Sequence, residues 1–197
     1  STMDLSKQSI IILSTNQHKL EELQAMMAPL GISISRYSGV FDVEEDGDTF
    51  EANAYKKLMG VAHQPGVVYL AEDSGLCVDA LGGRPGIFSA RYGGDGASNL
   101  DRCRLILEEL AGVESESRGA QFVCGIAVRY PNGETQYYEG CVRGRIAPDI
   151  QGENGFGYDP IFIPDGYSDT LGVLPAAVKH TLSHRAQAVQ KMLALSE

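Results

Sequence analysis

Apolar residues occur along this chain both in continuous runs and at helical spacing, and these patterns predict a series of strands and helices. The apolar run of residues 10–13 is typical of a strand that is covered on both faces. Residues 17–28 then place leucines and methionines on one face of a predicted helix. A strand at 32–37, a helix at 49–62 and a strand that starts after Pro65-Gly66 are expected next.

The second half of the chain predicts a hairpin between helices. Residues 121–129 and 135–144 have the pattern of two strands, and Pro131-Asn132-Gly133 between them is a strong turn signal. An amphipathic helix is expected near 98–111 and a closing helix at 183–195. Helices interspersed with strands, plus an antiparallel hairpin near 121–144, predict an α/β fold in which a mixed β-sheet is flanked by helices in three layers.

Composition narrows the classes of partner. The chain has 197 residues, of which 43% are hydrophobic, so it can bury a sizeable core. Its formal net charge of −10 disfavours a nucleic-acid polymer or an anionic membrane, because both are bound mainly through surplus Lys and Arg. A small anionic substrate is compatible with this charge if cations gather locally.

Neither the start of the chain nor its cysteines point to secretion. Residues 1–8 are polar, and no apolar run approaches the length of a membrane span, so we expect no secretory signal and no membrane anchor. The cysteines match neither a zinc pattern nor a small disulfide framework. We therefore expect a cytoplasmic protein with reduced thiols at four positions, namely Cys77, Cys103, Cys124 and Cys141.

The segment of residues 69–79 is the first candidate for chemistry. Here an apolar strand is expected to end in Glu72 and Asp73, followed by Ser74 and Gly75. Mg²⁺ prefers oxygen ligands and usually takes one or two protein carboxylates together with substrate phosphates. The acidic pair therefore indicates a Mg²⁺ site, and the alternative is a solvated strand end with an Asp-Ser-Gly turn.

A second candidate is the junction of residues 14–19, where the first strand meets the first helix. Ser14, Thr15 and Asn16 are residues that commonly precede a helix, and Lys19 follows one turn later. Unpaired amides and the positive end of the helix dipole attract anions, so the junction can bind phosphate. The alternative is an ordinary capped helix with an exposed lysine, and no Walker-type motif is present.

Two features near the C terminus could hold a base. In the loop of residues 155–160, two glycines allow a close approach to the backbone, and two aromatic rings can stack on a planar ligand. Lys179, His184 and Arg185 lie around the start of the last helix, where the dipole disfavours cations, so a bound polar ligand would explain them. The alternatives are a tight turn with core-packed rings and a structural histidine.

Taken together, these segments resemble the inosine triphosphate pyrophosphatase family over nearly the whole chain. The resemblance implies a homodimeric, Mg²⁺-dependent α/β enzyme that cleaves ITP, dITP and XTP to the monophosphate and pyrophosphate. It also implies a single nucleotide pyrophosphatase domain, residues 1–197, with two lobes around a central substrate cleft. The resemblance rests on six segments, which are Ser14-Thr-Asn-Gln-His-Lys19, Glu44-Glu-Asp-Gly47, Ala71-Glu-Asp-Ser-Gly-Leu76, Asp79-Ala-Leu-Gly-Gly-Arg-Pro-Gly-Ile-Phe-Ser-Ala-Arg-Tyr92, Gly155-Phe-Gly-Tyr-Asp-Pro160 and Ser183-His-Arg185.

The resemblance also implies roles for individual residues. Asp73 matches the essential acidic residue, a proton acceptor and metal ligand, and Glu44 matches a second metal carboxylate. A phosphate-facing lysine falls on Lys57, or alternatively on Lys56. The implied substrate-binding residues are Ser14, Thr15, Asn16, Gln17, His18, Lys19, Lys57, Ser74, Phe156, Gly157, Tyr158, Asp159, Lys179, His184 and Arg185.

Two departures from the family pattern affect the acidic groups. Most bacterial relatives have Asp where this chain has Glu72, so the roles of Glu72 and Asp73 in activating water are not separated by the resemblance. Some relatives carry Glu where this chain has Ala52, and an alanine side chain cannot bind a metal.

Two other functions stay open. One is a related nucleotide pyrophosphatase with another base preference, and the other is a nucleotide-binding module without catalysis. Such a module would bind nucleotide without Mg²⁺-dependent turnover, and the acidic pair argues against it.

Overall fold

A computed structural model describes residues 4–196 of the chain. It divides into two compact units, which are described separately. Unit 1 comprises residues 4–73, 124–140 and 185–196, and unit 2 comprises Ser74–Val123 and Cys141–His184. None of the helices described over residues 4–196 has the length and apolar character that a membrane span requires.

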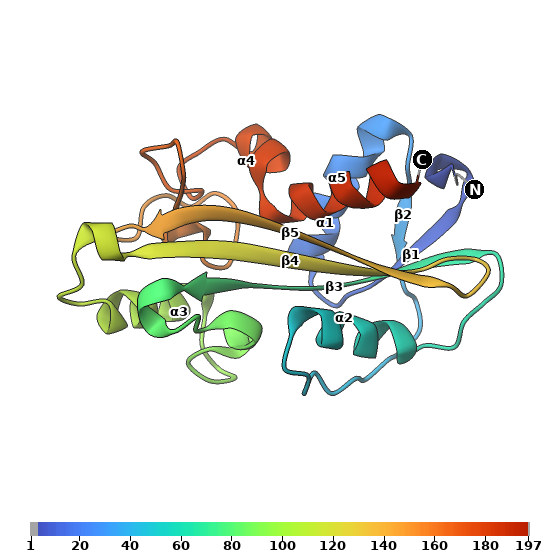
Figure 1. The fold of residues 1–197 in the computed structure, drawn as a ribbon, viewed down its shortest axis with the longest axis horizontal. Helices are drawn as coiled ribbons and strands as arrows, with labels where there is room; N and C mark the ends of the chain where they lie inside the picture. The colour runs from blue at the N-terminus through green and yellow to red at the C-terminus, as the bar shows by residue number, and fades with distance from the viewer. Residues whose placement is uncertain (1–3, 197) are drawn as a thin grey trace. The chain divides into compact units, whose positions relative to one another are not determined.

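The strands form a mixed six-stranded sheet in the order β2-β1-β3-β4-β5-β6 (Figure 1). Strand β1 pairs in parallel with both β2 and β3, whereas β5 pairs antiparallel with β6. The predicted hairpin is present, because β4 and β5 are neighbours joined by residues 130–134. The strand bounds are β1 Ser9–Leu13, β2 Ile34–Arg36, β3 Val67–Val78, β4 Gly119–Arg129, β5 Thr135–Ile146 and β6 Phe162–Pro164.

The helices agree closely with the sequence pattern. Thr49 caps the second helix by accepting a hydrogen bond from the Ala52 amide, and Ser98 forms a capping box with Asp101. The α-helices are α1 Gln17–Met27, α2 Phe50–Met59, α3 Asn99–Glu109, α4 Ala176–Leu182 and α5 His184–Ser196. Short 3-10 helices lie at Leu5–Lys7, Ala28–Leu30, Asp79–Leu81, Gly86–Arg91, Ser115–Ser117 and Asp159–Ile161.

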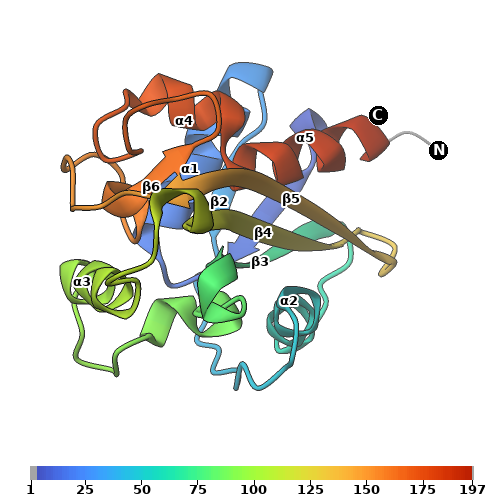
Figure 2. The same cartoon turned by 60° about the vertical axis from the view of Figure 1, so that its left-hand side comes forward.

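Unit 1 has three layers, as expected. Helices α1 and α5 lie on one face of its strands and α2 lies on the other (Figures 1 and 2). In β3, Val68 and Leu70 pack with α1 and α5, whereas Tyr69 and Ala71 pack with α2. This alternation follows from the two-residue period of a strand, so both faces of β3 must be apolar.

Unit 2 has its own core, which contains Cys103 and Ile106 of α3 and Leu110, the residue that caps the C-terminal end of α3. The side chain of Arg118 ties this unit together by donating to three backbone carbonyls, those of Leu110, Ile146 and Ala147. These bonds satisfy acceptors that burial would otherwise leave costly.

One expectation about the fold was wrong. Strand β3 does not end at Glu72 and Asp73 but continues to Val78, so the acidic pair lies in the middle of a strand. The alternative of a solvated strand end is also wrong, since Glu72 and Asp73 are only 3% and 7% exposed. Helix α4 and strand β6 were missed, because short elements show too little periodicity to be recognised.

The close approach of β5 and β6 allows a test of the packing. A Cβ atom added at Gly144 would lie 2.2 Å from the backbone oxygen of Ile163, whereas one added at Gly96 would meet nothing within 4 Å. We expect Gly144→Ala to lower the free energy of unfolding by about 1–3 kcal/mol through overpacking. Gly96→Ala is the matched control and should cause no loss, which urea unfolding of both variants would measure. Equal stability of the two variants would contradict the observed strand spacing.

Candidate active site

The junction between β1 and α1 presents a helix N terminus to solvent. The Asn16 side chain caps α1 by accepting from the Lys19 amide at 3.2 Å, and Ser14 accepts from the Asn16 amide at 3.1 Å. Thr15 and His18 are exposed beside them. From β2, the Arg36 guanidinium donates to the carbonyls of Ser14 and Thr15, at 3.3 and 3.1 Å. This arrangement has the fixed amides and the positive charge that bind an anion.

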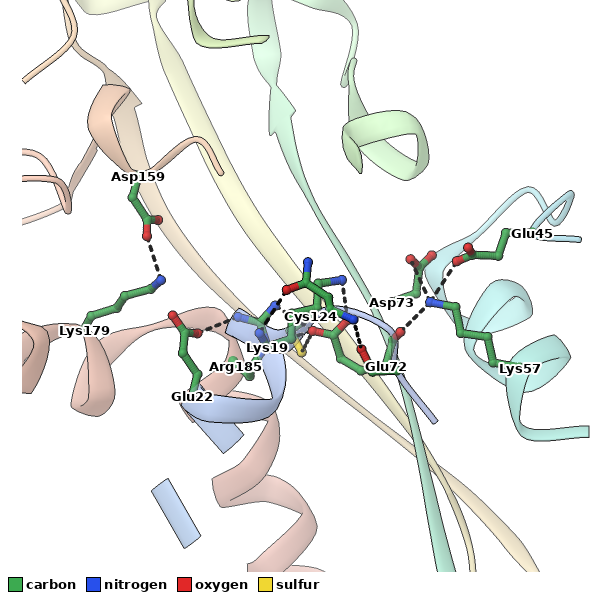
Figure 3. A network of polar contacts seen from close by, with 12 residues as sticks. Lys19, Glu22, Glu45, Lys57, Glu72, Asp73, Cys124, Asp159, Lys179 and Arg185 are labelled. Atoms are coloured by element: carbon green, nitrogen blue, oxygen red, sulfur yellow. Dashed lines mark hydrogen bonds and ion pairs between the residues drawn. The ribbon is translucent and has the colours of Figure 1, made fainter. Parts of the chain in front are cut away.

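Glu72 and Asp73 are neighbours in β3, but their side chains take part in different interactions. Glu72 continues the row of Val68 and Leu70, which faces α1 and α5, and Asp73 continues the row that faces α2. Figure 3 shows Glu72 among groups from α1 and α5 and Asp73 beside Lys57 of α2. The two carboxylates of the acidic pair therefore have different surroundings, and Asp73 rather than Glu72 has its side chain beside Lys57.

Glu72 is the centre of a buried ionic network within unit 1. Lys19 donates to one carboxylate oxygen at 2.8 Å, and Arg185 binds the other through two nitrogens at 2.6 and 2.7 Å. Arg185 also reaches Glu22 at 2.7 Å (Figure 3). Burial alone would raise the pKa of Glu72, but the charges of Arg185, Lys19 and Lys57 outweigh it and hold the pKa far below its ordinary value. Glu72 is therefore a permanent anion that orients cations.

Asp73 has the opposite character. Its nearest cation is Lys57, whose ammonium lies 3.9 Å from one carboxylate oxygen while donating to the Glu72 backbone carbonyl at 2.8 Å. Burial, and to a smaller extent the charge of Glu72, raise the pKa of Asp73 to about 6 even though Lys57 opposes the shift. The other oxygen of Asp73 is buried and has no hydrogen-bond partner within residues 4–196. A carboxylate of this kind can bind a cation or accept a proton near neutral pH.

Glu45 is a group that the sequence interpretation missed. Its carboxylate binds Lys57 at 2.8 Å, next to Asp73, whereas Glu44 of the same loop is exposed. Lys56 pairs with Asp46 away from this cluster, so Lys57 rather than Lys56 accompanies Asp73. The three acidic residues at 44–46 indicated a carboxylate near Asp73, but the sequence did not indicate which of the three contacts Lys57.

The loop of residues 155–160 in unit 2 is held by its own side chains. Asp159 accepts from the Phe156 amide at 3.0 Å and pairs with Lys179 at 2.7 Å, and the Lys179 ammonium lies 4.4 Å from the centre of the Phe156 ring. Gly155 is required, because a Cβ there would lie 2.1 Å from the Asp159 carboxylate. The Lys179 ammonium, which Asp159 holds, thus lies over one face of the Phe156 ring.

His184 and Arg185 begin α5, and both are buried. The His184 ring stacks on Phe122 with centroids 4.8 Å apart. Glu22 and Glu72 both neutralise Arg185, so protein groups already stabilise this cation at the helix start. Its role in substrate binding stays a prediction.

The predicted site residues fall into two groups. Unit 1 contains the residues predicted for the phosphates and the metal, which are Ser14, Thr15, Asn16, Gln17, His18, Lys19, Glu44, Lys57 and Asp73, together with Arg185. Unit 2 contains Ser74, Phe156, Gly157, Tyr158, Asp159, Lys179 and His184. Glu22, Arg36 and Glu45 also belong to the first group, and the sequence interpretation did not identify them.

Comparisons with known proteins agree over nearly the whole chain. The sequence profile of the Ham1 family matches residues 10–195. A dITP/XTP pyrophosphatase of Bacillus licheniformis is 41% identical over 94% of this chain and 96% of its own. The solved structure of the Staphylococcus aureus Ham1 protein superposes with a TM-score of 0.83 at 39% identity, covering 95% of this chain and 97% of that one. A HAM1 protein from Coxiella burnetii gives a TM-score of 0.84 at 37% identity, covering 95% and 98%.

The raised pKa of Asp73 has a consequence for stability. The folded protein holds this proton more tightly than the unfolded chain does, since the pKa is about 6 rather than 3.8. Ionisation as the pH rises through that interval therefore destabilises the folded state. In the presence of a chelator, we expect Asp73→Asn to be about 2 kcal/mol more stable than the parent protein at about pH 7.5.

Urea unfolding at several pH values measures this difference. It should vanish when the pH falls below the ordinary Asp pKa of 3.8, where Asp73 is neutral in both states. A parent protein that is the more stable of the two at neutral pH would show that the folded state favours the Asp73 charge.

Proposed function

This chain belongs to the Ham1 family, and from that membership and the site chemistry we propose that it hydrolyses dITP, ITP and XTP to the nucleoside monophosphate and pyrophosphate. The observation that carries the proposal is the cluster of Asp73, Lys57 and Lys19 in unit 1. It combines a buried carboxylate of raised pKa with Lys57 of α2 and with Lys19 in the first turn of α1, and hydrolysis of a phosphoanhydride can use such groups to offset charge and to accept a proton.

The triphosphate is assigned to the start of α1. The amides of this turn and the positive helix end favour an anion, and Lys19 supplies a full charge within the first turn. Glu72 and Arg36 hold the cation and the loop in place before a ligand arrives, so little of the binding energy is lost in ordering them.

Mg²⁺ is the proposed cofactor, and the residues present fit it. The unpartnered oxygen of Asp73 is a ready ligand, and the resemblance adds Glu44 as a second carboxylate, with Glu45 beside it. Mg²⁺ usually takes only one or two protein carboxylates, so it does not need a cluster of three or more His, Cys, Asp or Glu side chains, and residues 4–196 contain no such cluster. When bound, Mg²⁺ supplies positive charge to the triphosphate.

Asp73 is also the proposed proton acceptor. In the metal-free protein, a pKa of about 6 leaves most of this carboxylate ionised at neutral pH, so it can accept a proton there. Glu72 cannot do this, because its pKa is far below the ordinary range and Lys19 and Arg185 occupy both oxygens. Lys57 lies beside Asp73 and would offset charge on the phosphates after displacement of its own carboxylate partner.

The base is assigned to residues of unit 2, with the Phe156 ring as the stacking surface. Hypoxanthine and xanthine carry a 6-oxo acceptor, whereas adenine carries a 6-amino donor. Lys179 and His184 of the same unit are the proposed donors. A site that presents donors there rejects adenine, because the mismatch leaves buried polar groups unpaired.

The remaining proposals rest on the resemblance. We propose that the enzyme is a homodimer in the cytoplasm, and that residues 1–197 form one functional domain. The four cysteines are free thiols in the structure, as expected.

Product analysis with a panel of nucleoside triphosphates tests the function. With Mg²⁺, we expect ITP, dITP and XTP to give the monophosphate and pyrophosphate, and ATP to react about 10³-fold more slowly in kcat/KM. Release of inorganic phosphate and a diphosphate would contradict cleavage at the α–β bond. Nucleotide binding without turnover of any member would favour the non-catalytic module.

Asp73→Asn tests the assignment of the site. We expect kcat to fall at least about 10²-fold, because the substitution removes a charged ligand and the proton acceptor together. Asp95→Asn, at an exposed aspartate, is the matched control and should retain activity. Mg²⁺ should raise the melting temperature of the parent protein and of Asp95→Asn but not of Asp73→Asn. An Asp73→Asn variant with more than about a tenth of parental activity would exclude this role.

A further inference from the structure

The segment Asp79–Tyr92 was singled out by its sequence, yet the proposed reaction gives it no role. It contains the 3-10 helix Gly86–Arg91, in which Ser89 is buried at 6% exposure. A buried serine in a loop region must place its hydroxyl and its backbone groups in hydrogen bonds. The partners of Ser89 therefore indicate what this segment supports.

Ser89 connects two parts of unit 2 that are distant in sequence. Its hydroxyl accepts from the Leu76 amide at 2.9 Å and donates to the Gly86 carbonyl at 2.6 Å. Its backbone carbonyl accepts from the Tyr158 hydroxyl at 2.7 Å. Leu76 lies in β3 two residues after Ser74, and Tyr158 lies in the loop assigned to the base. One residue thus links the strand next to Ser74 with that loop.

The Tyr158 side chain has the properties of an anchor. It is 6% exposed and packs in the core of unit 2, and its hydroxyl is committed to Ser89. The flanking Gly157 is held through its carbonyl, which accepts from the Cys103 thiol at 3.5 Å. With positive φ angles of 71° at Gly155 and 61° at Gly157, the loop backbone gains much freedom when such contacts are removed.

We propose that Ser89 is a positioning residue for base recognition, and that the Tyr158 hydroxyl is the anchor through which it acts. This inference rests on the proposed function, because it needs the loop of residues 155–160 to bind the base. In that arrangement Tyr158 and Ser89 hold the backbone that carries the Phe156 ring at a fixed position. Loss of the anchor weakens base binding in the ground state and in the transition state alike, which raises KM and leaves kcat nearly unchanged.

A pair of matched substitutions tests the anchor. Tyr158→Phe removes only the hydroxyl that donates a hydrogen bond to the Ser89 carbonyl. Tyr92→Phe removes a hydroxyl that donates to the Glu109 carboxylate of α3. We expect Tyr158→Phe to raise the KM for ITP about five-fold, with kcat within about two-fold of the parent value. Tyr92→Phe should leave both constants within about two-fold. A role in stability alone would lower the melting temperature of Tyr158→Phe without moving KM, and this outcome would overturn the proposal.

Hydrogen exchange without nucleotide provides a readout that does not depend on turnover. Amides of residues 155–159 should exchange faster in Tyr158→Phe than in Tyr92→Phe. If the parent protein does not hydrolyse ITP, the proposed function fails, while the exchange rates still report whether the anchor holds the loop. Equal exchange in the two variants would show that the anchor does not exist.

A double-mutant cycle tests whether Ser89 acts through Tyr158. Ser89→Ala removes the hydroxyl that fixes the 3-10 helix to β3 and keeps the carbonyl that receives Tyr158. If the two residues act in series, the double variant should have a KM close to that of the weaker-binding single variant. Single effects that multiply in the double variant would show independent roles and overturn the positioning role of Ser89.

Discussion

The charge of Glu72 in the middle of β3 is the constraint on which the site depends. An ionised carboxylate in a sheet interior is very costly unless cations neutralise it. Here Lys19 comes from the first turn of α1 and Arg185 from the first turn of α5, so one buried anion ties two helix starts to the strand. Two cations contact Glu72, and Glu22 balances the additional positive charge by binding Arg185. The network thereby holds Lys19 near the helix N terminus that is assigned to the phosphates.

The alternation of side chains along a strand then gives Glu72 and Asp73 different chemistry. Glu72 faces two cations and stays ionised, whereas Asp73 has one more distant cation and a raised pKa. A carboxylate pair that shared one environment would have to share one role as well. At two adjacent positions, the structure thus places an anion that orients cations and a carboxylate of raised pKa.

The sequence predicted much of the fold, for identifiable physical reasons. The apolar run of β1, the helical spacing of residues 17–28 and the turn after β4 are local signals, and the structure confirms the elements that they predict. The length of β3 could not be predicted, because Glu72 and Asp73 resemble a polar strand end until their partners are known. Those partners are 53 and 113 residues away from Glu72 in the sequence. The same limit hid Glu22 and Glu45, whose roles depend on tertiary contacts.

The division of roles between the two carboxylates is the central claim, and a pH titration by NMR with ¹³C-labelled carboxyl groups measures it directly. The account predicts that the Asp73 carboxyl of the metal-free protein titrates near pH 6. The Glu72 carboxyl should remain ionised down to the pH at which the protein unfolds. Titration of Glu72 near neutral pH, or an Asp73 pKa at its ordinary value of 3.8, would contradict the account.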